Sequence, residues 1–218
     1  MSHQKRLSAP KHYPVDRKGL TYTTTAEGSR SPDQGITAVV FLREVLGYAE
    51  TKKEAKQIVK NGNLVRNGDT VRDVRDTIGV MDLVEITETG ESFRVLPRAE
   101  SLEFHETEDD RRAVKITGKR AEGENNIYSF HNGENYRTDE EYSTGTTLIF
   151  NDEVKSAEIA EGEETIILDG KHSGKIATVE ELHGRGMRSD TATVETDESE
   201  FEIRQDKLFA TGDLEVGQ

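Results

Sequence analysis

Apolar side chains recur at helical spacing over one stretch of this chain and at alternating spacing over much of the remainder. The helical stretch begins at Ile36 and meets a stop signal at Gly47; its apolar positions are Val39, Val40, Leu42, Val45 and Leu46. The pattern predicts a short helix there, followed by a second helix and then by many short strands.

The second helix is predicted from both of its ends. Thr51 and Glu54 have the Thr-x-x-Glu spacing of a capping box, and Asn61-Gly62 is a stop signal, so the helix should run from Lys52 to about Lys60. At about 100° per residue, the lysines gather on one face and the apolar residues on the other. The two faces consist of Lys52, Lys53, Lys56 and Lys60, and of Ala55, Ile58 and Val59.

Strand signals recur along the chain after this helix. Asn67-Gly68, the strongest short hairpin signal, separates strands expected at 64–66 and 70–72, and residues 80–86 give another strand. A second hairpin turn is expected at Asn132-Gly133. Further strands are expected at 112–117, 127–130, 147–150, 157–159, 165–168, 191–195 and 201–203.

The first 35 residues have little apolar periodicity and carry many cations among prolines and small polar residues. These cationic residues are Lys5, Arg6, Lys11, His12, Arg17 and Lys18. Residues 21–35 are too poor in large apolar side chains to pack alone, so we expect an extended arm that gains order on a partner. A floppy terminus is the alternative; nucleic-acid binding is favoured because basic extensions without a core typically track phosphates.

Composition limits the class of protein. Of the 218 residues, 32% are hydrophobic and 6% aromatic, which favours several small modules over one large core. The absence of cysteine excludes disulfides and cysteine-ligated zinc, and it fits a reduced intracellular setting. The apolar run 38–42 is far shorter than the roughly 20 residues of a membrane span, and the N-terminus lacks the apolar region of a signal peptide. We therefore expect a soluble, cytoplasmic protein that contacts no membrane.

The charge changes sign along the chain. Residues 1–75 carry 14 Lys or Arg and 8 Asp or Glu. Residues 76–218 carry 15 Lys or Arg and 35 Asp or Glu, and the whole chain has a net charge of −14. A basic front third predicts a polyanionic partner, most often nucleic acid. The later carboxylates are interleaved with Val, Ile and Phe, so they decorate folded surface rather than a disordered tail. Such a surface suits a high-salt cytoplasm, and we hypothesise a halophilic host.

The lysine face of the second helix has two interpretations. On most surface helices a charged face is merely solvated. Here the lysine arc contains no acidic partner four residues away, and Lys52 and Lys53 lie at the positive end of the helix dipole. Unpaired cations in that place favour an anion bound nearby.

Motifs of catalysis are not found. Between Gly170 and Gly174 there is one residue fewer than a P-loop needs, and Ile176 stands where Ser or Thr would hold magnesium, so nucleotide binding is rejected. The chain has no HExxH, no GxSxG and no cysteine nucleophile, its six histidines lack ligand spacing, and paired acids such as Asp109-Asp110 are expected to be solvated. We expect no catalytic residue, no metal and no cofactor.

Two stretches resemble known RNA-binding modules. The run 42–68 contains, in order, a helix, Gly47, a second helix, Gly62, a strand and Asn67-Gly68. This order resembles the αL RNA-binding fold of ribosomal proteins, pseudouridine synthases and tyrosyl-tRNA synthetases. That resemblance implies that the basic face of the second helix contacts RNA backbone. The run 169–179 resembles a KOW motif, in which glycines turn the chain between two strands of an SH3-like barrel, although Ala177 replaces a later glycine.

Taken together, these modules resemble one family across nearly the whole chain, the archaeal and eukaryotic small-subunit ribosomal protein family S-four-e. The runs 5–12, 39–43 and 209–212 also match it. The resemblance implies a non-catalytic protein that binds small-subunit ribosomal RNA (rRNA), contacts neighbouring ribosomal proteins and is not an independent homo-oligomer. Most members are basic, so this acidic chain departs from the family in charge, as a halophilic archaeal version would.

The resemblance also implies a domain plan and a set of RNA contacts. The plan is a multi-domain α+β chain: a basic extended arm (1–35), an αL domain (36–88), a central β-domain (89–164) and a KOW SH3-like domain (165–218). The expected RNA-binding residues are Lys5, Arg6, Lys11, His12, Arg17, Lys18, Arg43, Lys52, Lys53, Lys56, Lys60, Lys171, His172, Lys175, Arg185 and Arg188. An RNA-modifying enzyme and a transcription-elongation factor are alternatives; the first would need a catalytic domain, and the second would not need an αL module.

Overall fold

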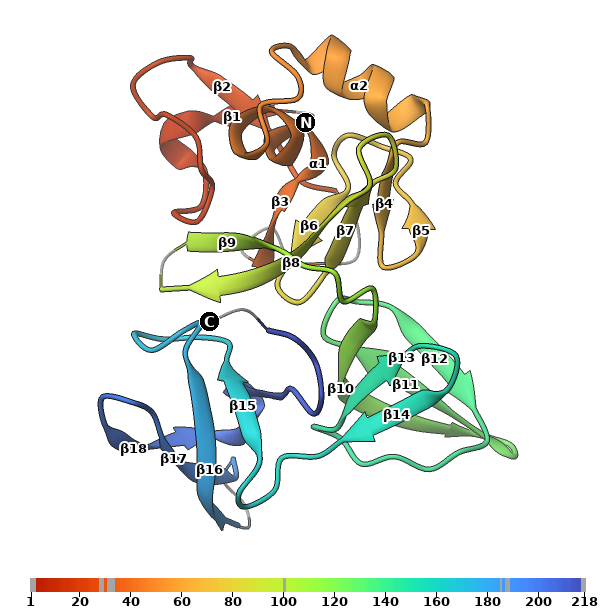
Figure 1. Ribbon diagram of the computed structural model, residues 1–218, viewed down its shortest axis with the longest axis vertical. Helices are drawn as coiled ribbons and strands as arrows, with labels where there is room; N and C mark the ends of the chain where they lie inside the picture. Colours follow the sequence, from red (N-terminus) through yellow and green to blue (C-terminus); the bar gives the residue numbers. More distant parts are fainter. Residues whose placement is uncertain are drawn as a thin grey trace. The chain divides into compact units, whose positions relative to one another are not determined.

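Short strands, arranged in several small sheets, are the main regular structure of the described residues (Figure 1). The computed structural model in Figure 1 describes residues 3–27, 30, 34–99, 101–184, 186 and 189–216. The chain divides into unit 1, Met1–Leu96 with Glu100–Asp110, and unit 2, Pro97–Ala99 with Arg111–Gln218. Few helices and several sheets agree with the expected α+β class.

Unit 1 contains the two predicted helical segments. α1 (Ala38–Val40) continues directly into a π-helical turn, Phe41–Val45, which was expected as ordinary helix. The segment ends before Gly47, whose φ of +69° is readily adopted only by glycine. α2 (Lys52–Lys60) has the predicted bounds.

Both halves of the predicted capping box form at the start of α2. The Thr51 hydroxyl accepts a hydrogen bond of 3.2 Å from the Glu54 backbone N–H, and the Glu54 carboxylate accepts one of 3.3 Å from the Thr51 N–H. The Glu50 N–H also donates to Glu54 at 2.8 Å, and these bonds, that from Glu50 first, hold the pKa of Glu54 below its usual value. The box satisfies N–H groups that have no partner within the helix.

The strands of unit 1 form one five-stranded sheet and two smaller pairs. The sheet has the order β5-β4-β7-β8-β9, from β4 (Leu64–Arg66), β5 (Asp69–Thr70), β7 (Leu83–Ile86), β8 (Glu91–Arg98) and β9 (Ser101–Glu106). The pairs are β1 (His3–Lys5) with β2 (Tyr22–Thr24), and β3 (Gly35–Thr37) with β6 (Thr77–Gly79). At the predicted Asn67-Gly68 hairpin, φ is positive at both residues, +54° and +86°, as a type I′ turn requires.

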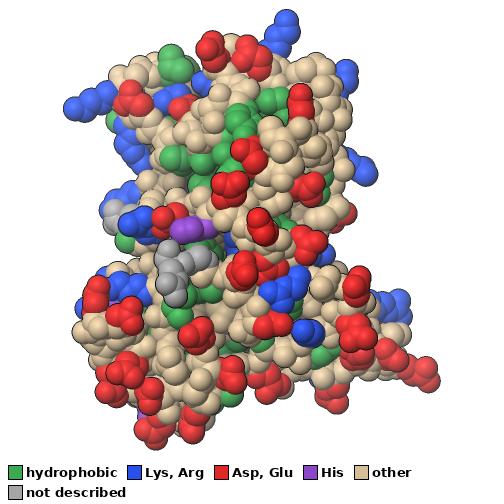
Figure 2. All heavy atoms as spheres, viewed as in Figure 1, with side chains coloured by type: hydrophobic (Ala, Val, Ile, Leu, Met, Phe, Trp, Pro, Cys, Tyr) green, Lys and Arg blue, Asp and Glu red, His purple; other side chains and the backbone are tan. Residues whose placement is uncertain are grey.

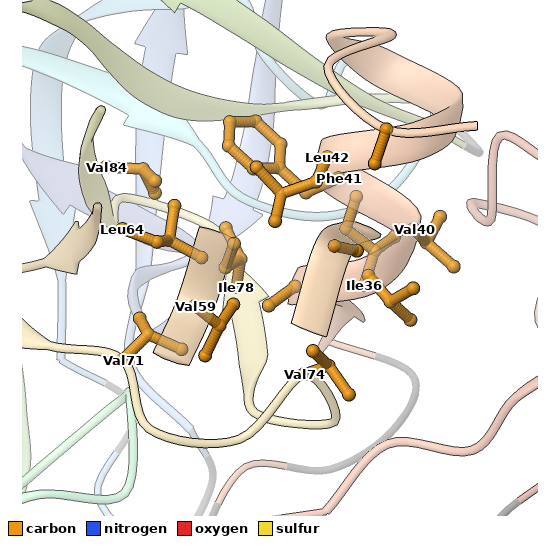
Figure 3. Close-up of a cluster of buried hydrophobic side chains, with 14 of the residues drawn as sticks. Ile36, Val40, Phe41, Leu42, Val59, Leu64, Val71, Val74, Ile78 and Val84 are labelled. Carbon is orange, nitrogen blue, oxygen red and sulfur yellow. The ribbon is translucent and has the colours of Figure 1, made fainter. Parts of the chain in front are cut away.

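The core of unit 1 lies where the two helices meet the strands (Figure 3). Ala55 and Val59 of α2 are buried, as the helical wheel predicts, and Figure 3 shows Val59 beside Leu64 of β4 and Val71. Phe41 and Leu42, from the π-helical turn, are fully buried in the same cluster. Burial of its apolar face fixes α2 with its lysines outward.

Residues 3–24 pack onto the core of unit 1, whereas the sequence predicts a separate extended arm for this segment. Ala9, Tyr13 and Val15 are buried and belong to the core cluster of unit 1, and β1 and β2 close the segment into a two-stranded ribbon. Local periodicity misses this packing because each of these apolar residues is isolated in sequence and buried only by distant partners.

A buried charge network lies beside β4 and β6. Arg30 donates two hydrogen bonds, of 2.7 and 2.9 Å, to the carboxylate of Asp82, which also accepts from Asn67 Nδ2 at 2.9 Å and from the Gly79 N–H at 2.8 Å. Burial by itself would raise the pKa of Asp82, but Arg30 and these hydrogen bonds hold it below its usual value.

Unit 2 contains two five-stranded sheets. The first has the order β12-β11-β10-β13-β14 and is built from β10 (Arg112–Glu122), β11 (Asn125–Phe130), β12 (Asn135–Thr138), β13 (Thr147–Phe150) and β14 (Val154–Ala157). Its core cluster includes Val114, Ile116, Tyr128 and Leu148. The predicted turn at Asn132-Gly133 links β11 to β12, whereas β14 lies earlier in the chain than the strand expected at 157–159.

The second sheet of unit 2 must curl. Its order is β18-β17-β16-β15-β19, from β15 (Glu164–Ile167), β16 (Ile176–His183), β17 (Thr191–Glu195), β18 (Glu200–Arg204) and β19 (Leu208–Ala210). The edge strands β18 and β19 are joined only by the 3-10 turn Gln205–Lys207. In a flat sheet these edges would stand roughly 19 Å apart, farther than about 14 Å of fully extended linker could span. The sheet therefore bends back on itself around its core.

A buried lysine joins the two sheets of unit 2. Lys115 of β10 donates hydrogen bonds to the carbonyl oxygens of Gln205 (3.0 Å), Asp206 (2.9 Å) and Leu208 (2.5 Å). Burial lowers the pKa of Lys115 to about 8, and the charge of Asp206 opposes that shift. The first sheet thus supplies the donor that satisfies carbonyls at the end of the second.

Candidate nucleic-acid interface

α2 presents a cationic face to solvent. Lys52, Lys53, Lys56 and Lys60 are all exposed, on the side of the helix away from the buried Ala55 and Val59. Within the described part of the chain none of the four forms an ion pair, although Lys52 helps Arg75 to lower the pKa of Asp73. The structure thus brings together the four lysines of the predicted face and leaves them available to an anion.

The cations of the N-terminal segment fall into two groups, and one of them is structural. Lys5, Lys11 and Lys18 are exposed. Arg6, by contrast, is only 4% exposed; its guanidinium donates to the Asp16 carbonyl at 2.9 Å, to the Tyr22 carbonyl at 3.3 Å and to the Glu44 carboxylate at 3.0 Å. Arg6, predicted to contact RNA, thus has its guanidinium bonded inside the protein and offers little of its side chain to a partner.

Arg17 and His12 are also engaged with the protein backbone. The Arg17 guanidinium donates to the carbonyl oxygens of Arg6 and Leu7, each at 3.4 Å, and of Pro10 at 3.0 Å. His12 Nε2 lies 2.8 Å from the Gly35 carbonyl oxygen. Both side chains are half-buried, so they shape the segment that carries the exposed lysines.

Arg43 lies on the chain that leads into α2. Its Nε donates to the Glu50 carbonyl at 3.2 Å, and its Nη2 is 3.7 Å from the Glu44 carboxylate, which also pairs with Arg6. Arg43 is half-buried, with part of its charge balanced by Glu44. Its position connects the N-terminal segment to the start of the lysine-bearing helix.

The predicted C-terminal cations lie in a more acidic setting. The turn between β15 and β16 has positive φ at Gly170 (+97°) and Gly174 (+85°), and Lys171 on it is exposed. His172 stacks on Phe201, with ring centroids 4.3 Å apart, and Lys175 pairs with Glu198 at 2.5 Å. Arg185 and Arg188 lie outside the residues that the structure describes.

A groove of about 700 Å³ beside Lys175 carries mainly negative charge. Its charged lining residues are Lys175, Glu164, Glu195, Asp197 and Glu198. Such a lining repels phosphate. In Figure 2, acidic side chains lie over both sheets of unit 2 together with some Lys and Arg, and further Lys and Arg side chains project beside the β1–β2 ribbon and from the region of α2. Of the described residues predicted to bind RNA, the exposed ones lie in unit 1, apart from Lys171.

A group of exposed apolar residues in the N-terminal segment is not predicted by the sequence pattern. Leu7, Leu20 and Tyr22 are 75%, 60% and 55% exposed. In the sequence, each of them is an isolated large apolar residue in a polar, basic stretch without periodicity. The buried residues Ala9, Tyr13 and Val15 have the same sequence context. Only the structure separates those that are buried from those that face solvent.

Other kinds of site have little support in the described residues. No group of three or more His, Asp or Glu side chains there is arranged to hold a metal ion. The helices in these residues also fall short of the length and hydropathy that crossing a membrane requires.

Comparisons with known proteins identify the class. No family model matches the chain. The small ribosomal subunit protein eS4 of Halorubrum lacusprofundi is 34% identical, and the match covers 94% of this chain and 91% of that protein. The protein of the same name from Halobacterium salinarum is 33% identical, and the match covers 92% of this chain and 91% of that protein. The 30S ribosomal protein S4e of Thermoplasma acidophilum, a crystal structure, superposes with a TM-score of 0.68 at 24% identity, covering 83% of this chain and 96% of that one, which shows a shared fold.

These matches place the chain in a class of small-subunit ribosomal proteins, in agreement with the fold and with the exposed cations of unit 1. Within that class it belongs to the eS4 family, as the sequence analysis expects. The family is one of ribosomal proteins and not of enzymes, and the two alternative functions receive no support. The relatives include proteins of halophilic archaea.

Proposed function

We propose that this chain is a structural constituent of the small ribosomal subunit, in the cytoplasm, where it binds and stabilises small-subunit rRNA. Family membership supports the ribosomal role. The observation that carries the RNA contact is the exposed lysine face of α2, which lacks ion-pair partners in the described residues of a chain whose net charge is −14. Cations without internal partners on an acidic protein fit an external polyanion.

Within this function, residues 36–88 act as an αL domain. The helix, turn and strand order through the Asn67-Gly68 hairpin supports this assignment, and so does the fixed outward direction of the lysines. Lys52, Lys53, Lys56 and Lys60 contact backbone phosphates, and Lys5, Lys11 and Lys18 extend the contact along a second RNA segment. Phosphate contacts position the protein, so recognition depends mainly on RNA shape.

Residues 165–218 act as an SH3-like domain of the KOW type. The glycine turn between β15 and β16 and the curl of the sheet support this assignment. Lys171 and His172 give it a small RNA contact within an acidic surface. The sheet built from β10 to β14 faces ribosomal neighbours; the expected central domain 89–164 is thereby shortened, because β8 and β9 belong to the sheet of unit 1. Lys175, paired with Glu198, contributes less.

The test replaces the four α2 lysines together with glutamine. We expect the variant to enter small subunits poorly, and the slope of log binding constant against log KCl concentration for rRNA to fall by about 3, since each lost phosphate contact removes about 0.7–0.9. Incorporation is measured by sedimentation of the tagged chain, and the slope by titration at several KCl concentrations.

A matched control removes the same charge from unit 2. Lys119, Arg137, Lys155 and Lys207 form ion pairs with acidic residues of the chain, and their joint change to glutamine should leave incorporation and slope unchanged. An equal loss of incorporation and slope in both variants would mean that binding depends on the net charge of the chain and not on the lysine face of α2. Normal incorporation of the α2 variant would refute the assignment.

A further inference from the structure

The N-terminal ribbon exposes more large apolar surface than any other region that the structure describes. Of five large apolar side chains that are exposed in the described residues, three lie within residues 7–22: Leu7, Leu20 and Tyr22. β1 ends at Lys5, opposite Tyr22, and the chain turns at once into the 3-10 helix Arg6–Ser8, whose first N–H donates to the Thr21 carbonyl; Leu7 on this turn and Leu20, which precedes β2, therefore belong to the same end of the ribbon. The three exposed side chains therefore gather at one end of the β1–β2 ribbon, and we call this group the apolar patch.

This patch is held in shape from inside the protein. Arg6 ties the Tyr22 and Asp16 carbonyls to Glu44, and Arg17 ties the carbonyls of Arg6, Leu7 and Pro10 together. Tyr13 and Val15, in the same segment, are buried in the core of unit 1. The two arginines and the buried side chains fix the backbone, so the exposure of Leu7, Leu20 and Tyr22 belongs to a built surface and not to a floppy end.

The patch carries cations at its edge. Residues 3–25 contain five Lys or Arg and a single Asp, and Asp16 accepts a hydrogen bond from the Lys18 N–H. Lys5 is the cross-strand partner of Tyr22, so both side chains lie on one face of the ribbon. Lys18, also exposed, lies two residues before Leu20. On a chain with net charge −14, such a patch is complementary to RNA, because its apolar side chains can contact bases and its lysines can contact phosphates.

His3 leaves at least one face of the Tyr22 ring uncovered, and Tyr22 is 55% exposed. His3 meets it edge to face, with the ring centroids 5.1 Å apart and the planes at 85°, so at most one face of Tyr22 is covered by His3. A nucleobase needs only one face in order to stack, and single-stranded RNA is commonly recognised by stacking of splayed bases on aromatic side chains.

We infer that the patch of Leu7, Leu20 and Tyr22 receives unpaired bases of the rRNA, with a base stacked on Tyr22 and Lys5 and Lys18 on the flanking phosphates. The inference rests on the proposed function and deepens it. It assigns to the N-terminal segment a contact with bases, beside the phosphate contacts of α2.

The experiment compares Tyr22→Ala with Tyr22→Phe in the full chain, using transcribed small-subunit rRNA of a halophilic archaeon as the probe. We expect the alanine variant to bind about tenfold more weakly, since removing a stacking aromatic typically has an effect of that order, whereas the phenylalanine variant keeps the affinity. The slope of log binding constant against log KCl should stay the same in both, because no phosphate contact is lost. Val154→Ala, at an exposed apolar residue of β14, is the control and should have no effect.

Chemical probing of unpaired bases supplies the second measurement. The wild type and Tyr22→Phe should protect one or a few bases that Tyr22→Ala leaves reactive, while protection that depends on the α2 lysines persists in all three. Circular dichroism and thermal unfolding check that the variants fold; an unfolded Tyr22→Ala is replaced by the double variant Leu7→Ser, Leu20→Ser, with the same expectation.

The outcomes separate this inference from the proposed function. If the wild type does not bind the rRNA selectively, the proposed function fails. If it binds selectively but Tyr22→Ala binds equally well and protects the same bases, the inference is overturned and the proposed function stands. If Tyr22→Ala binds naked rRNA normally yet enters subunits poorly, the patch meets a neighbouring protein, and the assignment to RNA bases is likewise overturned.

Discussion

Individual charged residues in this chain take opposite roles according to burial. Arg6 and Lys18 are both cations of the same basic segment, yet Arg6 is enclosed by three carbonyl or carboxylate acceptors and Lys18 is exposed. A guanidinium with its planar fork of donors suits several acceptors at once, whereas a lysine holds a single point charge on a flexible stem. In this segment the arginines build the surface and the lysines present charge on it.

Asp82 gives the first prediction at this scale. Its carboxylate is 1% exposed and pairs with Arg30, so Asp82→Asn leaves a buried guanidinium without its counter-charge. We expect the free energy of unfolding to fall by about 3 kcal/mol. Denaturant unfolding measures it, with Asp69→Asn on the exposed hairpin as a control that changes stability by less than about 0.5 kcal/mol. A loss in Asp82→Asn no larger than in the control would show that the buried pair adds no stability.

The same carboxylate gives a pH dependence. The pKa of Asp82 is lowered in the folded chain, so its contribution to stability is present above the unfolded pKa and is lost as pH falls through the folded value. We expect the wild type to lose more unfolding free energy than Asp82→Asn when pH is lowered from about 5 to 2. Parallel pH profiles of the two proteins would exclude Asp82 as the source.

The contribution of Lys115 to stability also rises with pH, but in the alkaline range. Burial lowers its pKa to about 8, below the ordinary value of 10.5, so between these values the unfolded chain binds more protons than the folded chain. Stability from this group must then rise with pH across that interval. We expect the difference in unfolding free energy between the wild type and Lys115→Met to grow in favour of the wild type from about pH 8 to 10. A constant difference over that range would contradict the lowered pKa.

At the level of elements, the sequence predicts best where a local rule decides the structure. The capping box and Gly62 give the bounds of α2, and the Asn67-Gly68 pair gives its hairpin, because the backbone preferences of a few neighbouring residues suffice. The packing of the N-terminal segment and the burial of Arg6 were not predictable, since both depend on residues far away in the chain. For the candidate site, the lysine face was therefore foreseen and the apolar patch was not.

The glycine turn between β15 and β16 offers a prediction with a matched control. Both Gly170 and Gly174 have positive φ, but a Cβ on Gly170 would meet nothing within 4 Å, whereas one on Gly174 would lie 2.0 Å from the Pro97 carbonyl oxygen. Gly170→Ala should therefore lower the free energy of unfolding by about 1 kcal/mol, because of the backbone conformation alone. Gly174→Ala should lower it clearly more, because the new Cβ also clashes with the Pro97 carbonyl oxygen. Equal losses in thermal unfolding would show that the close approach to Pro97 does not matter.

At the scale of the whole molecule, the charge reversal separates two tasks. Available cations gather on the helix and the N-terminal segment of unit 1, while many cations of unit 2, such as Lys119, Lys155 and Lys207, pair with neighbouring acids. Such exposed pairs add little stability individually. They do leave the remaining carboxylates in excess, so folding of the whole chain must work against its own negative charge.

That excess leads to a prediction for the complete protein. Repulsion between exposed charges reaches over about 10 Å at 0.1 M salt and only about 3 Å at 1 M, so added salt should relieve it more in the compact folded state than in the expanded unfolded chain. We expect the midpoint of urea unfolding to rise steadily as KCl is increased from 0.1 M to 2 M. The control protein is a variant in which several carboxylates of unit 2 are changed to amides, and the control solute is sucrose, which is uncharged and also favours compact states. Sucrose should raise the unfolding midpoints of the wild type and the variant equally, whereas charge screening by KCl should raise that of the wild type more. That variant should need less KCl for the same midpoint. Full stability of the wild type at low salt, unchanged by KCl, would remove the physical basis for a halophilic host.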